Sequence, residues 1–486
     1  MALRVYNTLT RKKEEFVPRK PGRVDIYQCG VTPYDYTHVG HARQYVFWDT
    51  VRRYLTYRGW EVFCVQNVTD VDDKIISRAH KEGVEFTEIS EKYHKDFLDV
   101  MDRLGVKRPE VMPKVTEHIP EIIKVIEGLI KRGHAYEVEG DVFFDVVSFP
   151  DYGKLSRRSL DDMMAGVRIE LNPKKRNALD FVLWKSSKPG EPSWDSPWGK
   201  GRPGWHIECS ALALEYLGTG FDMHGGGDEL MFPHHENEIA QSQAYTGEKP
   251  FSRYFVHHAM LNIGDVKMSK SLGNFFSVRD VLDQVEPGVI RYFFASRHYR
   301  SPANYGVEEL EEASKAYSRL KSTLDAGKRA LAEVDKKQPT VSNENKSCRV
   351  DLFAAARDSK RKFIEGMNDD FNTAIGIASL HDLVRPINDF LHATGGGAQH
   401  DRQNLEGLKE AISTLETLGG VLGLFQEAED PDDGETMDSL VKLLIDIRDD
   451  LRSKKEWGLA DKIRNSLKEM NIVLEDTPVG TIWKKI

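Results

Sequence analysis

Two histidines and two glutamates fall within five positions in the segment MFPHHENEIA, residues 231–240. His234 and Glu238 are four residues apart, so a helix would place them on one face, about one turn from each other. That separation suits two ligands of one metal ion. Two ligands do not complete a site, and the remaining donors must come from elsewhere in the chain.

Two cysteines are candidates for the missing donors. Cys209 lies in GWHIECS, and Cys29 ends a probable sheet strand, at the carboxyl edge where parallel α/β sheets gather their ligands. Two sulfurs, an imidazole and a carboxylate form a set typical of Zn²⁺. A lone His–x₃–Glu pair is nonetheless more often a surface pair. The competing ligands are His224, His235 and Glu236, whereas Cys64, inside a strand pattern, is expected in the core.

A second motif, TPYDYTHVGH at residues 32–41, lies between a predicted strand and a predicted helix. Helix N-termini attract anions, and Gly40 allows a ligand to approach the backbone between His38 and His41. The pattern favours polyphosphate binding. Taken alone, it is equally compatible with a helix start that carries two solvated histidines.

A third motif, KMSKS at residues 267–271, places Lys267 and Lys270 among small residues. Such a loop is able to close on phosphates and stabilise the charge that develops on them. Any short basic loop looks similar, so this motif gains meaning only from its combination with the other two.

The elements that must position these residues follow a β–α–β order. Residues 23–29 and 61–68 read as buried strands and 39–59 as the helix between them, which predicts a parallel nucleotide-binding sheet. Residues from about 121 to 200 interrupt this pattern as an insertion. Beyond about 280 the pattern is helical, and an acidic stretch at 427–438 precedes the tail.

The composition is that of a multidomain protein without a membrane span. The chain has 486 residues, 40% hydrophobic, and no apolar stretch reaches the ~18–20 residues that a span requires, which predicts a cytoplasmic protein. Four scattered cysteines make no disulfide framework. The net charge of −9 argues against a nucleic-acid partner for the chain as a whole. From residue 441 onward, however, the chain has ten Lys/Arg and eight Asp/Glu, so this segment is where a nucleic acid would be held.

HVGH and KMSKS together resemble the paired signatures of class I aminoacyl-tRNA synthetases. Within that class the chain is identified as a member of the cysteinyl-tRNA synthetase family by blocks in the family order, from near residue 20 to the last residues. These blocks are YQCGVTPYDYTHVGHAR, NVTDVDDKII, GRPGWHIECSA, FPHHENEIAQS, KMSKSLGN, MNDDFNTA and LEDTPVGTIW.

The resemblance implies a Rossmann-type parallel sheet with an inserted connective segment, then an all-α bundle and a small C-terminal tRNA-binding domain. The expected parts are a first catalytic half at 1–120, the insertion at 121–200, a second catalytic half at 201–265, a KMSKS and stem-contact region at 266–320, a helical bundle at 321–426, and an acidic linker with the anticodon-binding domain at 427–486.

The resemblance also implies roles for individual residues. Zinc would be bound by Cys29, Cys209, His234 and Glu238, and the cysteine pocket would be shaped by Gly30, Thr69, Trp205 and His224. ATP, with Mg²⁺, would be handled by His38, Gly40, His41, Lys267 and Lys270, and the anticodon would be met by Arg452, Trp457, Asp461 and Asp476.

The implied reaction joins L-cysteine to tRNA(Cys) through an adenylate, carried out by a monomer with one zinc ion. Two alternatives are an ATP-dependent ligase that joins cysteine to an amino sugar and a non-catalytic protein with a structural zinc. One departure from the family is Glu229, which stands where an aspartate is usual.

Overall fold

The computed structural model describes residues 2–165, 173–263, 266–267, 277–336, 350–393, 402–426, 433–454, 456–469, 472–477 and 480–485. The chain divides into two compact units, residues 1–426 and 427–486, each of which is described by itself. Within the described residues, every helix is too short or too polar to cross a bilayer.

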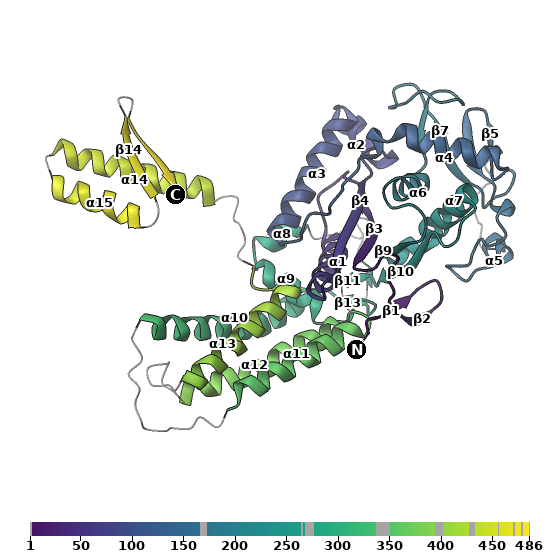
Figure 1. Cartoon of the computed structure of the whole chain (residues 1–486). Coiled ribbons are helices and arrows are strands. Elements are labelled where there is room, and N and C mark those ends of the chain that lie inside the picture. The colour runs from purple at the N-terminus through teal and green to yellow at the C-terminus, as the bar shows by residue number, and fades with distance from the viewer. Residues whose placement is uncertain are drawn as a thin grey trace. The chain divides into compact units, whose positions relative to one another are not determined.

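The centre of the first unit is a four-stranded sheet whose strands are all parallel (Figure 1). Its spatial order is β10 (Ser252–His258), β9 (Phe221–Gly227), β3 (Arg23–Val31), β4 (Glu61–Val68). Helix α1 (Val39–Tyr57) connects β3 to β4, so the β–α–β order expected from the sequence is confirmed.

The two faces of this sheet belong to different hydrophobic cores. Val24 and Ile26 of β3 enter one core together with α1, whereas Tyr27 and Cys29 enter the other. Helices α6 (Trp205–Tyr216) and α7 (Glu236–Thr246) cover this second face. Because side chains alternate along a strand and both faces are covered, β3 contributes buried residues to both cores.

Between β4 and α6 the chain builds a second layer with its own antiparallel sheet. Its four strands are β5 (Ala135–Val138), β6 (Asp141–Phe144), β7 (Phe181–Ser186) and β8 (Gly201–Pro203), in that order. The same stretch of chain contains the helices α2 (Asp73–Glu82), α3 (Phe86–Arg103), α4 (Ile119–Lys131) and α5 (Leu160–Ala165), with short turns η1 (Val115–Glu117) and η2 (Val146–Ser148). Of these, α3 joins the core that contains α1.

The last part of the first unit is mainly helical. Helices α10 (Val307–Lys336), α11 (Leu352–Asn368), α12 (Thr373–Ala393) and α13 (Arg402–Val421) pack as a bundle (Figure 1). Before it come α8 (Val278–Leu282), α9 (Pro287–Ala295) and a small sheet of β12 (Val266–Lys267), β11 (Leu261–Ile263) and β13 (Ala303–Asn304). The N-terminal hairpin of β1 (Arg4–Asn7) and β2 (Lys12–Glu15) is tied to the bundle, since Asp370 accepts a 2.8 Å hydrogen bond from the Tyr6 amide.

The second unit combines two helices with a hairpin. Helices α14 (Asp433–Ser453) and α15 (Trp457–Glu469) precede β14 (Ile472–Thr477) and β15 (Gly480–Lys485), which pair antiparallel. Five buried residues form its core: Val441, Ile445, Leu467, Ile472 and Leu474.

A buried ion pair joins α1 to the helices that follow the four-stranded parallel sheet. The carboxylate of Asp49 lies 2.5 Å from the guanidinium of Arg291 on α9 and 2.6 Å from that of Arg53. Arg291 also donates to the carbonyl of Leu422, just beyond α13, at 3.2 Å. Burial opposes ionisation of Asp49, but the two arginines outweigh it, and the pKa of this carboxyl is lowered. The pair therefore fixes α1 against both α9 and the bundle.

Replacing Asp49 by alanine is expected to lower the free energy of unfolding by about 3–5 kcal/mol, because it leaves the charge of Arg291 buried without its partner. Chemical denaturation followed by circular dichroism measures the change. The matched control is Asp358→Ala, which breaks an exposed pair with Arg361 and should cost less than about 1 kcal/mol. Equal losses in the two variants would contradict a structural role for the buried pair.

Candidate active site

The site lies at the carboxyl edge of the central sheet, between the two strands from which the chain connections run in opposite directions across the sheet. Strand β3 has β4 on one side and β9 on the other, so the connections that leave β3 and β9 diverge at their carboxyl ends. In open parallel sheets, ligands bind in the crevice at this point. Cys29 lies near the end of β3 and the HVGH turn follows it, which places both at the same edge.

The four predicted metal donors meet at this edge. The donor atoms of Cys29, Cys209, His234 and Glu238 all lie within 4.8 Å of one another, and all four residues are buried. The Nε2 atom of His234 is 3.0 Å from Oε1 of Glu238, and the sulfur of Cys29 is 3.8 Å from the same oxygen. His234 is in η4 (Met231–His235) and Glu238 is in α7, and the kink of this segment, at Phe232, precedes both. The two side chains therefore face each other at i,i+4 spacing, as the sequence predicts.

A second donor set overlaps the first. Cys29 and Glu238 are also grouped with His224 and His235, whose ligating atoms satisfy the same distance limit. His235 lies 3.1 Å from the Cys29 sulfur through Nε2, while its Nδ1 is 2.7 Å from His257. Both histidines are therefore metal-capable by geometry.

Glu236, the third competitor, has a structural position instead. Its carboxylate accepts hydrogen bonds from the backbone amides of Leu155 and Ser156 at 3.2 and 2.8 Å. It thereby holds the inserted segment against the start of α7, and it belongs to neither donor set.

The electrostatics of the cluster favour ionised donors at two positions. Burial opposes charge on Glu238, but His224 and His234 outweigh it and hold its pKa well below the usual value. A hydrogen bond from Cys29 lowers the pKa of Cys209 to about 6, whereas burial and the neighbouring Cys209 raise that of Cys29. Glu238 is therefore ionised near neutral pH, and Cys209 is the more acidic of the two thiols, so both residues are suited to bind a cation.

The residues predicted to shape a cysteine pocket surround these donors. Trp205, the first residue of α6, stacks on His234 with ring centroids 4.3 Å apart. His224 on β9 lies 2.8 Å from Glu238 through Nε2. The hydroxyl of Thr69 donates to Glu208 at 2.7 Å. At Gly30 an added Cβ would lie 1.5 Å from the carbonyl oxygen of Asn67, so no side chain fits there.

The HVGH turn is compact and partly buried. His38 caps α1 by accepting a hydrogen bond from the His41 amide at 3.3 Å, and the two rings stack with centroids 3.6 Å apart. Burial lowers the pKa of His38 to about 4 and that of His41 well below its usual value. Both imidazoles are therefore neutral hydrogen-bonding groups at pH 7.

Two predicted phosphate ligands cannot be placed. Lys270 lies outside the described residues, and of Lys267 only the backbone, in β12, is described. Glu229, the departure from the family pattern, lies in the turn η3 (Asp228–Leu230), where its carboxylate folds against Gly227.

Three residues that the sequence analysis did not single out hold the site together. The side-chain oxygen of Asn67 accepts a hydrogen bond from the Gly30 amide at 2.9 Å and lies 3.6 Å from the Cys209 sulfur. Gln44 donates to the Cys29 carbonyl at 2.9 Å, and Glu208 accepts from Thr69. Asn67 was detectable in principle, because it is the penultimate residue of the predicted strand 61–68, near the same carboxyl edge as Cys29.

The predicted anticodon residues lie in the second unit. Trp457 begins α15 and is 56% exposed, and Asp461 follows one helical turn later, also exposed. Arg452 is in the last turn of α14, and Asp476 is on β14, where only its backbone is described.

Two family descriptions match the chain. Residues 15–315 match the tRNA synthetases class I (C) catalytic domain, and residues 362–426 match the DALR domain. A Cysteine–tRNA ligase of Carboxydothermus hydrogenoformans is 50% identical over 485 residues, covering 100% of both chains. The Cysteine–tRNA ligase of Heliobacterium modesticaldum is 49% identical over 486 residues, again covering 100% of both. The chain belongs to the cysteine–tRNA ligase family.

The family resemblance expected from the motifs is thus confirmed, as is the classification as a class I aminoacyl-tRNA synthetase. Solved structures agree on the fold. A putative arginyl-tRNA synthetase from Campylobacter jejuni has a TM-score of 0.58 at 14% identity, covering 85% of this chain and 95% of that one. A methionyl-tRNA synthetase from Mycobacterium tuberculosis, in complex with methionyl-adenylate, has a TM-score of 0.57 at 15% identity, covering 82% and 89%.

Proposed function

We propose that the protein attaches L-cysteine to tRNA(Cys) in two steps. The cysteine carboxylate attacks the α-phosphate of ATP and releases pyrophosphate, and the terminal ribose of the tRNA then captures the cysteinyl adenylate. The observation that carries this proposal is the convergence of the buried donor cluster and the HVGH turn at one edge of the parallel sheet.

The donor cluster fits a zinc ion by its chemistry. Two sulfurs, an imidazole and a carboxylate are all buried and lie close enough to share one cation, and this donor set is typical of Zn²⁺. Cys29, Cys209, His234 and Glu238 would hold the ion. When bound, it would supply a soft Lewis acid that stabilises a thiolate in preference to an alcohol.

Selection of cysteine over serine is the problem that such a site addresses. The two amino acids differ by one atom, and a shape difference of that size is worth only ~1–3 kcal/mol, whereas a discrimination of ~10⁴ needs about 5.5 kcal/mol. A thiol with a pKa near 8.5 ionises far more readily than a hydroxyl. Recognition through sulfur therefore supplies selectivity that packing against Trp205 and Thr69 does not.

Positioning and charge stabilisation would supply the rest of the catalysis. The neutral imidazoles of His38 and His41 and the start of α1 would orient the phosphates of Mg²⁺-bound ATP, with Gly40 allowing close approach of the backbone. We assign Lys267 and Lys270 to the same phosphates. Gly30 and His224 would complete the cysteine pocket.

The second unit would recognise the anticodon. The exposed Trp457 is suited to stacking on an unpaired base, and Arg452, Asp461 and Asp476 would contact neighbouring groups. We further propose a monomeric, cytoplasmic enzyme. Neither an amino-sugar ligase nor a structural zinc protein is favoured, because the chain is matched over its full length by Cysteine–tRNA ligases.

Exchange of labelled pyrophosphate into ATP tests the first step without tRNA. Purified protein is expected to catalyse exchange with cysteine at least ~10³-fold more efficiently than with serine, and a chelator that removes the metal should abolish it. The control reaction omits the amino acid. Exchange that proceeds equally with serine would contradict recognition of the substrate through its sulfur. Absence of cysteine-dependent exchange would contradict the proposed enzyme activity itself.

A further inference from the structure

Two buried residues outside the HVGH turn connect it to the ends of the segment that carries KMSKS. The proposed function places the phosphates of ATP against both motifs, which are more than 200 residues apart in the sequence. Misplacement of a reacting group by about 1 Å costs on the order of 100-fold in rate. The fold must therefore fix one motif against the other.

Arg43 holds the start of α1 against two separate chain segments. It begins the second turn of α1, just after the HVGH turn, and is 5% exposed. Its guanidinium donates to the backbone carbonyls of Met260 at 2.8 Å, Tyr299 at 3.1 Å and Ser301 at 2.6 Å. Burial lowers the pKa of Arg43 to about 10, so the side chain stays charged at pH 7.

These carbonyls lie at the starts of the strands that lead into KMSKS. Met260 directly precedes β11, Ser301 lies two residues before β13, and β11 pairs with both β13 and β12. Strand β12 ends at Lys267, the first residue of KMSKS, whose backbone lies opposite Asn262 of β11. Arg43 therefore fixes the entry of the KMSKS segment relative to the HVGH turn.

Asp96 of α3 holds the other end of the same segment. Its carboxylate is 5% exposed, accepts a hydrogen bond from the Thr37 amide at 3.2 Å and lies 2.6 Å from the guanidinium of Arg279, in the first turn of α8. The Thr37 carbonyl in turn accepts a hydrogen bond from the Val278 amide at 2.8 Å. The residue before HVGH and the helix after KMSKS are thus joined twice.

We propose that Arg43 and Asp96 are positioning residues for adenylate formation. Each fixes one end of the segment that contains KMSKS to the HVGH element, so that groups of both motifs meet the same phosphates in the required geometry. The inference rests on the proposed function, because it concerns the placement of the motifs that we assign to ATP.

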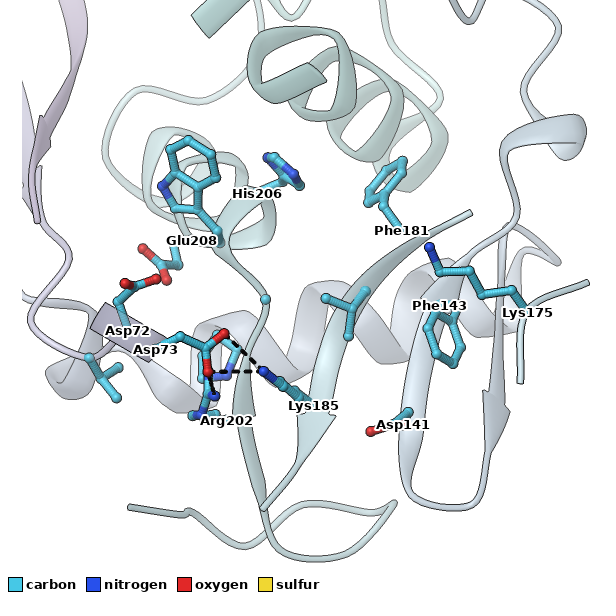
Figure 2. Close-up of a pocket in the computed structure, with 15 residues that line it drawn as sticks. Asp72, Asp73, Asp141, Phe143, Lys175, Phe181, Lys185, Arg202, His206 and Glu208 are labelled. Carbon is cyan, nitrogen blue, oxygen red and sulfur yellow. Dashed lines mark hydrogen bonds and ion pairs between the residues drawn. The ribbon is translucent and has the colours of Figure 1, made fainter. Parts of the chain in front are cut away.

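The cysteine side of the site is built from other residues. A cavity of about 400 Å³ lies beside Trp205, and its walls come from the start of α2, the insertion and the start of α6 (Figure 2). Among the described residues, neither Arg43 nor Asp96 lines this cavity or belongs to a metal donor set. Their replacement is therefore expected to change kcat and to leave the KM for cysteine and the zinc content unchanged.

Arg52→Lys is the matched control for Arg43→Lys in the full-length protein. Arg52 lies on the same helix, is 6% exposed and donates to the carbonyls of Lys107 and Arg108, both at 2.8 Å. A lysine keeps the charge but lacks the planar fork that reaches several carbonyls at once. Both changes remove a comparable set of contacts from α1, but only those of Arg43 lie between the two motifs.

Arg43→Lys is expected to lower kcat of cysteine-dependent pyrophosphate exchange by roughly 100-fold per active site, with no change in the KM for cysteine. Active sites are counted by the adenylate formed per chain, so loss of folded protein does not contribute to the result. Arg52→Lys should keep the wild-type rate per active site. An equal rate per active site in the two variants overturns the proposal.

A double-mutant cycle with Lys270 shows whether Arg43 acts through the KMSKS segment. Arg43→Lys should cost at most a few-fold in a Lys270→Ala background, because a group that it positions is already absent. Arg52→Lys should have the same small effect in both backgrounds. If the losses from Arg43→Lys and Lys270→Ala multiply in full, Arg43 acts elsewhere and the proposal is wrong.

Asp96→Ala tests the other end of the segment, with Asp283→Ala as its control. Asp283 pairs with Arg103 at 3.0 Å and so joins α3 to the end of α8 at the surface. Asp96→Ala should lower kcat by roughly 10-fold, and Asp96→Asn, which still accepts from the Thr37 amide, should recover part of the loss. A full rate in Asp96→Ala overturns the proposal, whether or not Arg43→Lys folds.

Exchange by the wild type separates this inference from the proposed function. If the wild type catalyses cysteine-dependent exchange but Arg43→Lys and Asp96→Ala match their controls, only the positioning roles fail. If the wild type shows no such exchange, the proposed function fails, and this inference fails with it.

Discussion

Cys209→Ser is expected to release the metal and to reduce cysteine-dependent pyrophosphate exchange by more than about 100-fold. Loss of groups that only support a metal ligand costs ~10–100-fold, so loss of a direct ligand should cost more. Cys209 is the thiol whose pKa the cluster lowers, and a serine hydroxyl at that place would not ionise at neutral pH. Metal content after gel filtration and the exchange rate measure the two effects.

Cys64→Ser is the matched control, since it makes the same chemical change at a buried thiol in the other core. It should retain about one zinc ion per chain and near-normal exchange, despite a modest loss of stability. If Cys209→Ser kept its metal, the overlapping set of Cys29, His224, His235 and Glu238 would be the zinc site instead.

Ending the chain after Gln426 is expected to reduce charging of tRNA(Cys) by roughly 100-fold while leaving pyrophosphate exchange almost intact. The deletion removes the whole second unit, residues 427–486, and all four residues that we assign to the anticodon. Each stacked base contributes about 1–3 kcal/mol, so the loss of several contacts accounts for the size of the effect. The ratio of charging to exchange, measured on one preparation, isolates tRNA recognition from catalysis.

A single substitution refines this result. Trp457→Ala should weaken charging by roughly 10-fold through loss of one stacking platform. Leu459→Ala, on the same helix and similarly exposed at 52%, should have little effect. Charging by the truncated protein at the full-length rate would refute the assignment of the second unit to tRNA.

The sequence predicted the class of fold because the strands are buried on both faces. The runs 23–29 and 61–68 are rich in β-branched and aromatic residues, with apolar side chains on both faces, as in a covered parallel sheet, and β3 and β4 are found there. The helix from 39 was equally clear, because Ala42, Val46, Val51 and Leu55 repeat with helical spacing and all are buried. The hairpin of β14 and β15 was not predicted, since the tail was interpreted from its charge and its family resemblance and not from its strand pattern.

The donor types were also readable from sequence, because few residues other than Cys, His and Glu bind zinc. The meeting of Cys29 with Cys209, about 180 residues later, was not determined by any local pattern. It depends on the pairing of β9 with β3. Helix α6, which carries Cys209, directly precedes β9 in the chain, and the pairing brings it close to the end of β3, where Cys29 lies. Family resemblance supplied the choice among competing ligands.

What the sequence by itself determined is the chemistry available: the donors, the HVGH turn and the periodicity of the elements that carry them. What only the tertiary structure decided is the environment of these groups. Burial makes His38 and His41 neutral, Asn67 closes the space over Gly30, and the insertion adds a cavity beside Trp205. The physical reason is that burial and proximity arise from contacts between residues far apart in the chain, and no local pattern encodes them.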